Sequence, residues 1–215
     1  MTNRSGTEPD GRGRPSGTTM QDHAFRRLSE EPILCDLLGY WERKRGDKEV
    51  PDRRDIDPTE MPPSLLPHLC LIEICENDRL KLRLVGTGIV RQHKRDNTGK
   101  FVDEYLKGDY LAYLTALYLE LRARRLPVLT ESVFRHPGTH LETTRLLLPL
   151  TWGGADLRLV LMGQVFRYRS GHPNLPIAQP LDAGSLEILN QITLDRVARD
   201  ATRPPRPASE AGAPS

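Results

Sequence analysis

Residues 140–168 read HLETTRLLLPLTWGGADLRLVLMGQVFRY and carry the clearest strand pattern of the chain. The leucines at alternate positions within 157–161 are typical of a strand with one buried face. Gly153 and Gly154 interrupt the apolar pattern, and glycine readily takes the positive φ that tight hairpin turns need. The segment therefore predicts two antiparallel strands, 140–152 and 155–168, joined by a short turn.

The same alternation predicts three more strands, at 68–75, 79–86 and 128–136. Between the second and third of them, residues 87–125 change to helical spacing and predict a short helix, a glycine-containing loop and a helix of about four turns. This order predicts an α+β fold with a five-stranded antiparallel sheet and a helical insert on one face. A pocket between sheet and insert is then the expected place for a small ligand.

Helices are predicted on both sides of this core. The segment 29–45 has an apolar stripe that must cover either its own sheet or a second copy of the chain. The residues of this expected dimer interface are Ile33, Leu34, Leu37, Leu38 and Trp41. A proline-rich spacer and a C-terminal helix are predicted within 169–199, while 1–28 and 200–215 have the composition of disordered ends. The folded domain is thus predicted to span 29–168.

Composition excludes several classes of protein. The chain has 215 residues, 37% of them hydrophobic, and a net charge of +2, which suits one globular domain and does not favour nucleic acid. It has no apolar run that could span a membrane, and its N-terminus lacks the apolar centre of a secretory signal. Three cysteines are too few for a disulfide framework, so we expect free thiols and a cytoplasmic location.

Motifs that carry catalytic chemistry are missing from the sequence. It has no phosphate-binding glycine loop, no HExxH zinc motif and no GxSxG nucleophile motif, so we expect neither an enzyme nor a metal site. His93 is the one histidine of the helical insert, in the charged run RQHKRD (91–96). That setting favours an exposed imidazole over one that faces a pocket and ligates a haem.

Several short sequence words occur in a characteristic order. They are YW (40–41), DIDP (55–58), LPHL (66–69), RLVGT (83–87), RDNTG (95–99) and LLPL (147–150). With the strand order, they resemble a bacterial family of stand-alone PAS-domain proteins over about residues 30–168. The resemblance implies a sensory or interaction module with no assigned ligand or cofactor. About 47 residues follow 168, too few for a further effector domain, so the output is expected to be contact with another protein.

Strand parity and the apolar face of the insert predict which side chains line the pocket, and Arg95 is added as a cation at its lip that could meet an anion. The predicted ligand-binding residues are Leu82, Leu84, Ile89, Val90, Arg95, Tyr105, Leu114, Tyr118, Leu147 and Leu161. On pattern alone the apolar members fit a packed core better than a binding site. The two tyrosines favour a ligand, because a buried hydroxyl needs a partner.

The leading hypothesis is a cytoplasmic regulatory protein that acts through protein–protein contact, as a homodimer tuned by a small molecule. The alternative is a small enzyme or ligand carrier that uses the same pocket. Two or more titratable side chains turned into the pocket would favour the enzyme, whereas an aliphatic interior would favour an interaction module. Nucleic-acid binding through arginine-rich edges is a weaker third hypothesis, and strongly salt-dependent DNA binding would support it.

Overall fold

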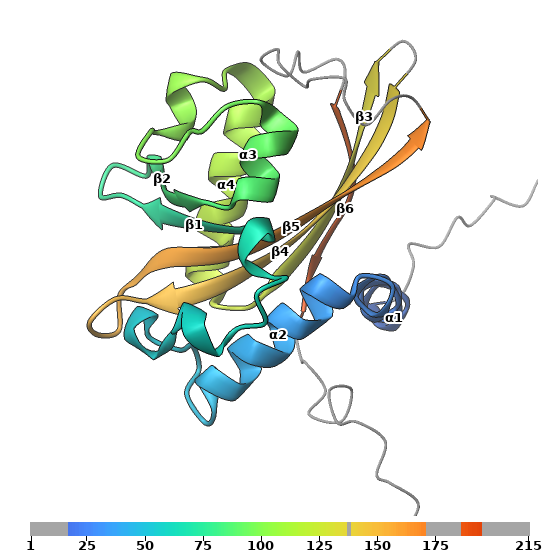
Figure 1. Cartoon of the computed structure of the whole chain (residues 1–215). Helices are drawn as coiled ribbons and strands as arrows, with labels where there is room; N and C mark the ends of the chain where they lie inside the picture. The colour runs from blue at the N-terminus through green and yellow to red at the C-terminus, as the bar shows by residue number, and fades with distance from the viewer. Residues whose placement is uncertain (1–16, 137–138, 171–185, 195–215) are drawn as a thin grey trace, which may run out of the picture.

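The computed structural model describes residues 17–136, 139–170 and 186–194 (Figure 1). The helices are α1 (Gly17–Ser29), α2 (Pro32–Arg45), α3 (Thr87–His93) and α4 (Gly108–Arg124), and the strands are β1 (Leu69–Ile74), β2 (Leu80–Val85), β3 (Val128–His136), β4 (Thr139–Thr151), β5 (Leu157–Ser170) and β6 (Leu186–Thr193). Within the described ranges, no helix has both the length and the apolar character needed to cross a membrane.

The strands form one twisted, six-stranded sheet in the order β2-β1-β5-β4-β3-β6. Every neighbouring pair in it is antiparallel. The five strands predicted from the alternating pattern are all present, and the helical insert between β2 and β3 lies on one face, so the predicted α+β class is confirmed. β4 and β5 are the longest strands and run through the middle of the sheet, where they carry most of its core.

The predicted C-terminal helix is wrong where the structure describes it. Leu186–Thr193 is instead the edge strand β6, paired with β3, and the remaining residues of that prediction lie outside the described part of the chain. Its exposed Glu187 and Gln191 alternate with partly or fully buried Ile188 and Ile192, a pattern of period two that the leucines of this segment obscure. Pairing here also satisfies the backbone groups along the open edge of β3.

The predicted disordered arm over 1–28 is also wrong from Gly17 onward, where α1 begins. Ala24 and Leu28 are buried four residues apart, and Met20 continues the same face, so one stripe of α1 packs against the core. The polar composition of the flanking sequence hides this stripe. The rest of the arm, the spacer and the C-terminal tail fall outside the described residues.

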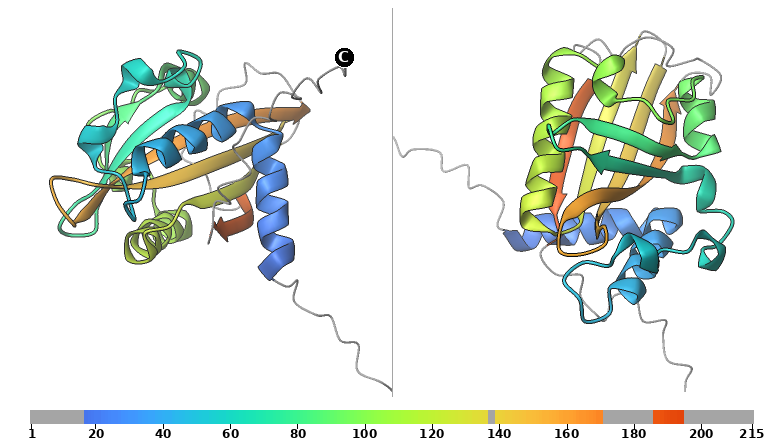
Figure 2. Two further views of the ribbon diagram at one scale, coloured as in Figure 1. Left: turned by 90° about the horizontal axis from the view of Figure 1, so that it is seen from below. Right: turned by 90° about the vertical axis from the view of Figure 1, so that its left-hand side faces the viewer.

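α2 covers the face of the sheet opposite to the helical insert (Figure 2). A Cβ on Gly163 of β5 would lie 2.5 Å from Cδ2 of Leu37 and 2.9 Å from Cδ2 of Leu34, so the helix lies directly on the strand backbone. Four of the five residues predicted to form a dimer interface are buried in this contact within the chain, and Ile33 packs partly against the same core. The predicted interface is therefore wrong, because its apolar stripe covers its own sheet.

Gly86, between β2 and α3, is packed where no side chain fits. Its N–H donates to the carbonyl of Leu69 at 2.7 Å, and a Cβ would lie 2.5 Å from the backbone oxygen of Pro67. We expect Gly86→Ala to lower the free energy of unfolding by about 1–3 kcal/mol, because the backbone must shift to remove the overlap. Urea unfolding followed by circular dichroism measures this.

Gly154→Ala is the matched control for Gly86, since a Cβ there would meet no atom within 4 Å. It should leave the midpoint of unfolding nearly unchanged. Equal effects of the two substitutions would show that the close approach at Gly86 does not constrain the fold.

Candidate functional site

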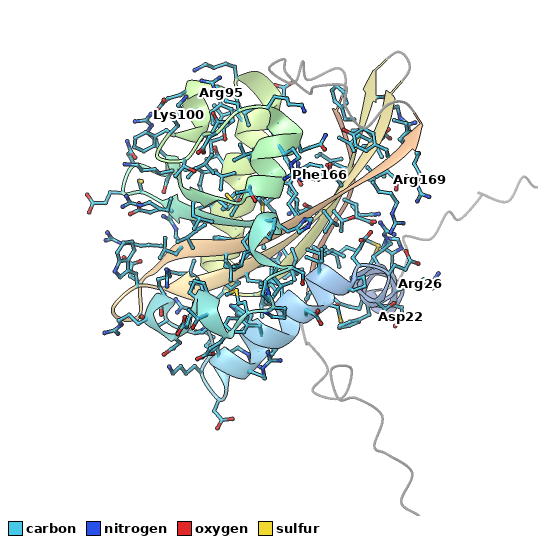
Figure 3. The ribbon with its side chains drawn as sticks, in the orientation of Figure 1. Asp22, Arg26, Arg95, Lys100, Phe166 and Arg169 are labelled. Carbon is cyan, nitrogen blue, oxygen red and sulfur yellow. The ribbon has the colours of Figure 1, made fainter. Side chains whose placement is uncertain are left out.

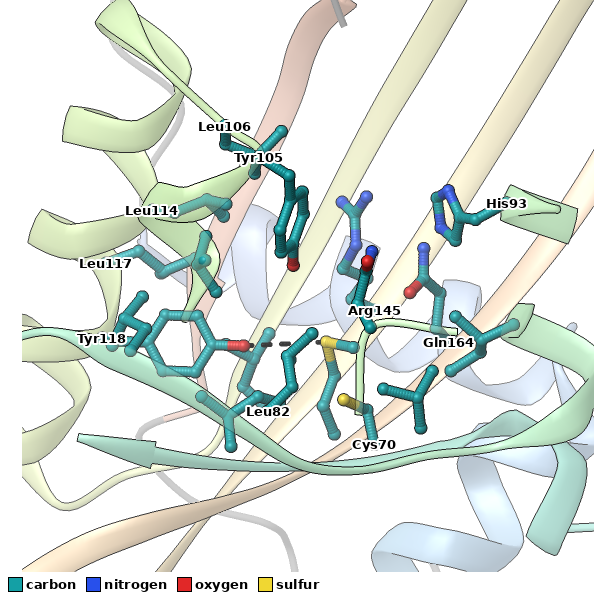
Figure 4. Close-up of a pocket in the computed structure, with 18 of the residues that line it drawn as sticks. Cys70, Leu82, His93, Tyr105, Leu106, Leu114, Leu117, Tyr118, Arg145 and Gln164 are labelled. Atoms are coloured by element: carbon teal, nitrogen blue, oxygen red, sulfur yellow. Dashed lines mark hydrogen bonds between the residues drawn. The ribbon is translucent and has the colours of Figure 1, made fainter. Parts of the chain in front are cut away.

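A cavity of about 170 Å³ lies between the sheet and the helical insert (Figure 4). That volume far exceeds the roughly 10–15 Å³ that one water molecule needs. Its walls come from β1, β2, β3, β4 and β5 on one side and from α3, α4 and the turn before α4 on the other. The lining residues are Cys70, Ile72, Leu80, Leu82, Val85, Ile89, His93, Arg95, Asn97, Val102, Tyr105, Leu106, Tyr110, Tyr113, Leu114, Leu117, Tyr118, Thr130, Arg145, Leu147, Met162 and Gln164.

Seven of the ten side chains predicted to contact a ligand line this cavity. They are Leu82, Ile89, Arg95, Tyr105, Leu114, Tyr118 and Leu147. Their placement together follows from the strand order and from the single helix face that α4 presents. That they contact a ligand stays a prediction.

The other three predicted lining residues do not reach the cavity, each for a geometric reason. Leu161 pairs with Leu148 and so faces α2, because β5 turns the neighbouring Met162 toward the cavity. Val90 follows Ile89 on α3 and is therefore rotated by about 100° away from the cavity wall.

Leu84 does not face the cavity as predicted, because β2 contains a bulge. Ile72 pairs with Leu82 and Leu71 with Leu84, so Arg83 is an extra residue and the two leucines face opposite sides. Leu84 is 47% exposed as a result. A one-residue bulge of this kind leaves no mark in the alternating pattern of RLKLRLVG.

His93 is the largest correction at the site. Its imidazole lines the cavity instead of facing solvent, on the same helix face as Ile89 one turn earlier, and it makes an edge contact with the ring of Phe166 at 5.8 Å. Burial and, to a smaller extent, the positive charge of Arg145 lower the pKa of His93 from 6.5 to about 4. The imidazole is therefore neutral at pH 7.

Arg145 of β4 and Gln164 of β5 are paired across the sheet and form, with His93, the polar end of the cavity (Figure 4). One guanidinium nitrogen of Arg145 donates to Oγ of Ser132 at 3.1 Å. Among the described residues, no carboxylate oxygen lies within ion-pair distance of this guanidinium. A partly buried cation without a counter-ion inside the protein is unusual, since buried charges are normally paired.

Four further polar atoms of the cavity lining lack a hydrogen-bond partner among the described residues: Nε2 of Gln164, Oγ1 of Thr130, Oδ1 of Asn97 and the hydroxyl of Tyr113. Thr130 is only 2% exposed and Gln164 only 3%. Most buried polar groups in proteins are hydrogen-bonded, so several unpartnered ones around a single cavity indicate a place where polar ligand atoms bind.

The opposite end of the cavity is apolar, with leucines from β2 and α4 around the ring of Tyr118. The Tyr118 hydroxyl lies 3.7 Å from Sδ of Met162, a weak contact for a buried phenol. Burial raises the pKa of the Cys70 thiol to about 12, so this lining cysteine is a neutral thiol at pH 7 and not a nucleophile.

The loop RDNTG (95–99) forms the rim. Asp96 accepts a hydrogen bond from the backbone N–H of Thr98 at 2.8 Å, and Gly99 has a φ of +84°, so the segment is an ordinary polar turn. Figure 3 shows Arg95 and Lys100 on the outer side of the insert, and Arg95 also lines the cavity. An exposed cation at this position favours the approach of anions.

On the other face of the sheet, Glu131 of β3 holds α1. Its carboxylate lies 2.7 Å from Nε2 of His23 and accepts hydrogen bonds from Arg27 at 2.5 Å and Asn190 at 2.7 Å. Burial raises the pKa of Glu131, but the combined hydrogen bonds from His23, Arg27 and Asn190 outweigh it, so the net shift is downward. Glu131 is therefore ionised at neutral pH and ties α1 to both β3 and β6.

The half-buried imidazole of His93 makes stability depend on pH. Between pH 6.5 and about 4 the unfolded chain binds a proton at His93 that the folded chain does not, so the free energy of unfolding falls as the pH falls. From pH 7 to pH 5 we expect a loss of roughly 2 kcal/mol from this group. Urea unfolding at the two pH values measures it. His93→Gln should flatten the dependence in this range, and an unchanged slope would contradict the assignment.

Comparison with known protein families gives a match. Residues 30–163 match a family model described as a PAS domain, which covers more than half of the chain. No curated protein and no solved structure matches. The matched segment runs from α2 to β5 and contains the whole helical insert, and therefore most of the cavity wall.

Proposed function

The chain belongs to the PAS domain family, and from this premise we propose that it is a regulatory module that binds a small molecule in its cavity and signals to a partner protein. The observation that carries the proposal is the cavity itself, whose lining holds one guanidinium without a counter-ion and four polar atoms without a hydrogen-bond partner, as far as the described residues go, beside apolar walls. A core that served packing alone would leave such groups unpaired at a cost of about 1–3 kcal/mol each.

Adjacent residues on β3 and β4 connect the cavity with the helix α1 on the other face of the sheet. Thr130 and Arg145 face the cavity, while their neighbours Glu131 and Thr144 face α1, because side chains alternate along a strand. Arg27 of α1 contacts both of these neighbours, at 2.5 Å to Glu131 and 3.3 Å to Thr144. A ligand that shifts β3 and β4 therefore changes the contacts that hold α1, and α1 is the proposed surface that a partner protein recognises.

Native mass spectrometry of the freshly purified full chain tests the proposal. We expect a retained small-molecule mass, which Leu114→Trp should abolish by filling the cavity while the circular dichroism spectrum stays unchanged. The same spectra report whether the chain is a dimer. A chain with no retained mass, which also binds no small molecule from an extract of its source cells, would overturn the proposal.

Hydrogen exchange tests whether ligand binding in the cavity is coupled to α1. Loading the cavity should change amide exchange over 17–29, and Arg27→Gln should remove this response. Arg26→Gln is the matched control, since Arg26 is exposed one residue earlier on the same helix. Equal responses in both variants would show that Arg27 does not carry the coupling.

An enzyme or ligand carrier is the second candidate function. His93, Tyr105 and Arg145 all turn titratable groups into the cavity, which is the feature expected of a catalytic pocket. Against catalysis, burial raises the pKa of Tyr105 and of Cys70, and the low pKa of His93 makes it a weak base, so these groups suit binding better than proton transfer. Recovery of the retained molecule unchanged after incubation supports binding, whereas a new mass supports catalysis.

We further propose that the protein acts in the cytoplasm, as stand-alone bacterial PAS proteins do. Cys35, Cys70 and Cys75 are all free thiols, which suits a reducing compartment. The nearly balanced net charge of +2 favours a protein partner over nucleic acid.

A further inference from the structure

We infer that the cavity binds an amphipathic monocarboxylate, with the carboxylate on Arg145 and the apolar body between the sheet and α4. The inference rests on the proposed function, since it names the chemical class of the ligand for the same cavity. It is carried by the polar and apolar ends of the cavity, which are separated along its length (Figure 4).

Arg145 supplies the charge that this ligand must match. A guanidinium has five N–H donors, of which one is satisfied by Ser132 at 3.1 Å. The remaining donors form a planar fork, and carboxylates accept two parallel hydrogen bonds from such a fork. Among the described residues that line the cavity there is no Asp or Glu, so a negative charge in this position has to come from the ligand.

Neutral groups that line the same cavity as Arg145 complete a site for the two oxygens of a carboxylate. Within the part of the chain that the structure describes, Gln164 and Tyr113 each have a donor without a partner, and Thr130 adds a hydroxyl. Asn97 adds a side-chain amide whose oxygen is also without a partner there. Arg145 and Tyr113 line the same cavity, and the positive charge of Arg145 works against the upward effect of burial on the pKa of the Tyr113 phenol. His93, neutral at pH 7, can accept or donate one further hydrogen bond.

The charge balance favours a carboxylate over a phosphate ester. One guanidinium neutralises a single negative charge, and Arg95, the second cation among the lining residues, is exposed at the rim. A dianionic phosphate would leave one charge uncompensated in a partly buried cavity, which is costly.

The apolar end of the cavity determines which kind of body the carboxylate ligand should have. Leu82, Leu106, Leu114 and Leu117 surround it and offer no charge and no strong hydrogen-bond donor. Transfer of each buried CH₂ group from water contributes about 0.8 kcal/mol. An aliphatic chain attached to the carboxylate is therefore the body that these walls favour.

Isothermal titration of the full chain with straight-chain acids of six to twelve carbons tests the inference, with octanoate and 1-octanol as the matched pair. Octanoate should bind at least tenfold more tightly than 1-octanol at pH 7. Arg145→Gln should weaken octanoate binding by roughly 10- to 100-fold, since a hydrogen bond to a charged group is lost. The affinity of Arg145→Lys for octanoate should lie between those of the unaltered chain and of Arg145→Gln, because lysine keeps the charge and lacks the planar pair of donors.

Arg122→Gln is the matched control, because Arg122 is paired with Asp78 at 2.9 Å and does not line the cavity. It should bind octanoate within twofold of the unaltered chain. Nuclear magnetic resonance of the His93 imidazole adds a second readout: octanoate should raise its pKa, because the bound carboxylate compensates the charge of Arg145.

The outcomes separate this inference from the proposed function. Equal binding of octanoate and 1-octanol, tighter binding of octyl phosphate, or a haem absorption band in the purified chain would overturn the carboxylate class, while a retained mass would still support ligand binding. Absence of binding by every acid in the series, with no retained mass in native spectra, would overturn both.

Discussion

Leu37→Asp should unfold the domain. Leu37 is fully buried, and its Cδ2 lies so close to β5 that a Cβ on Gly163 would be 2.5 Å away. The substitution removes this packing and places a carboxylate against an apolar strand, so we expect the free energy of unfolding to fall by more than about 4 kcal/mol. Because whole domains are stable by only about 5–15 kcal/mol, circular dichroism should show a largely unfolded chain or a steep drop in melting temperature.

Leu84→Asp is the matched control for this prediction. Leu84 is 47% exposed on β2, so the same chemical change should alter the free energy of unfolding by less than about 1 kcal/mol. A folded Leu37→Asp variant that changed from dimer to monomer in light scattering would restore the dimer interface on α2 and contradict the packing described above.

The sequence predicts those helices and strands in which apolar residues recur at a constant spacing over several residues. In the sequence, the leucines of β2 and β5 alternate with other residues and α4 has a broad apolar face. The sheet and its helical insert could therefore be predicted. β6 and α1 were missed for a common reason: each has few buried side chains and depends on contacts with β3. β6 pairs with β3 along the sheet, and α1 is held by side-chain hydrogen bonds to Glu131 of β3. Such long-range contacts leave a weak local pattern, and flanking polar sequence then dominates the prediction.

The apolar part of the cavity was more predictable than its polar end. Leu82, Leu114 and Leu147 follow from strand parity and helix face. Arg145 was overlooked, although it lies two residues before Leu147 on the same strand and hence on the same face. A charged residue within a long strand run was thus the available signal. His93 gave no such signal, since its neighbours are charged and its burial depends on where α3 packs.

Trp41→Ala should be strongly destabilising as well, because it removes the contact that ties α2 to β4. The indole is 1% exposed, and its Nε1–H donates to the backbone oxygen of Pro149 at 2.9 Å. Loss of the buried ring should cost about 3–5 kcal/mol, part of it from the Pro149 carbonyl left without a donor. Trp41→Phe keeps most of the packing and should cost about 1–3 kcal/mol, which isolates the hydrogen bond.

The second tryptophan provides both control and probe for this test. Trp152 is 50% exposed in the loop between β4 and β5, so Trp152→Ala should change the free energy of unfolding by less than about 0.5 kcal/mol. Because the chain has two tryptophans, emission from the Trp152→Ala variant reports Trp41 alone and should shift to longer wavelength on unfolding. Pro149 lies on the strand that also carries Arg145, so Trp41→Ala should in addition weaken octanoate binding. A Trp41→Ala variant with near-normal stability would show that α2 does not hold β4 in place.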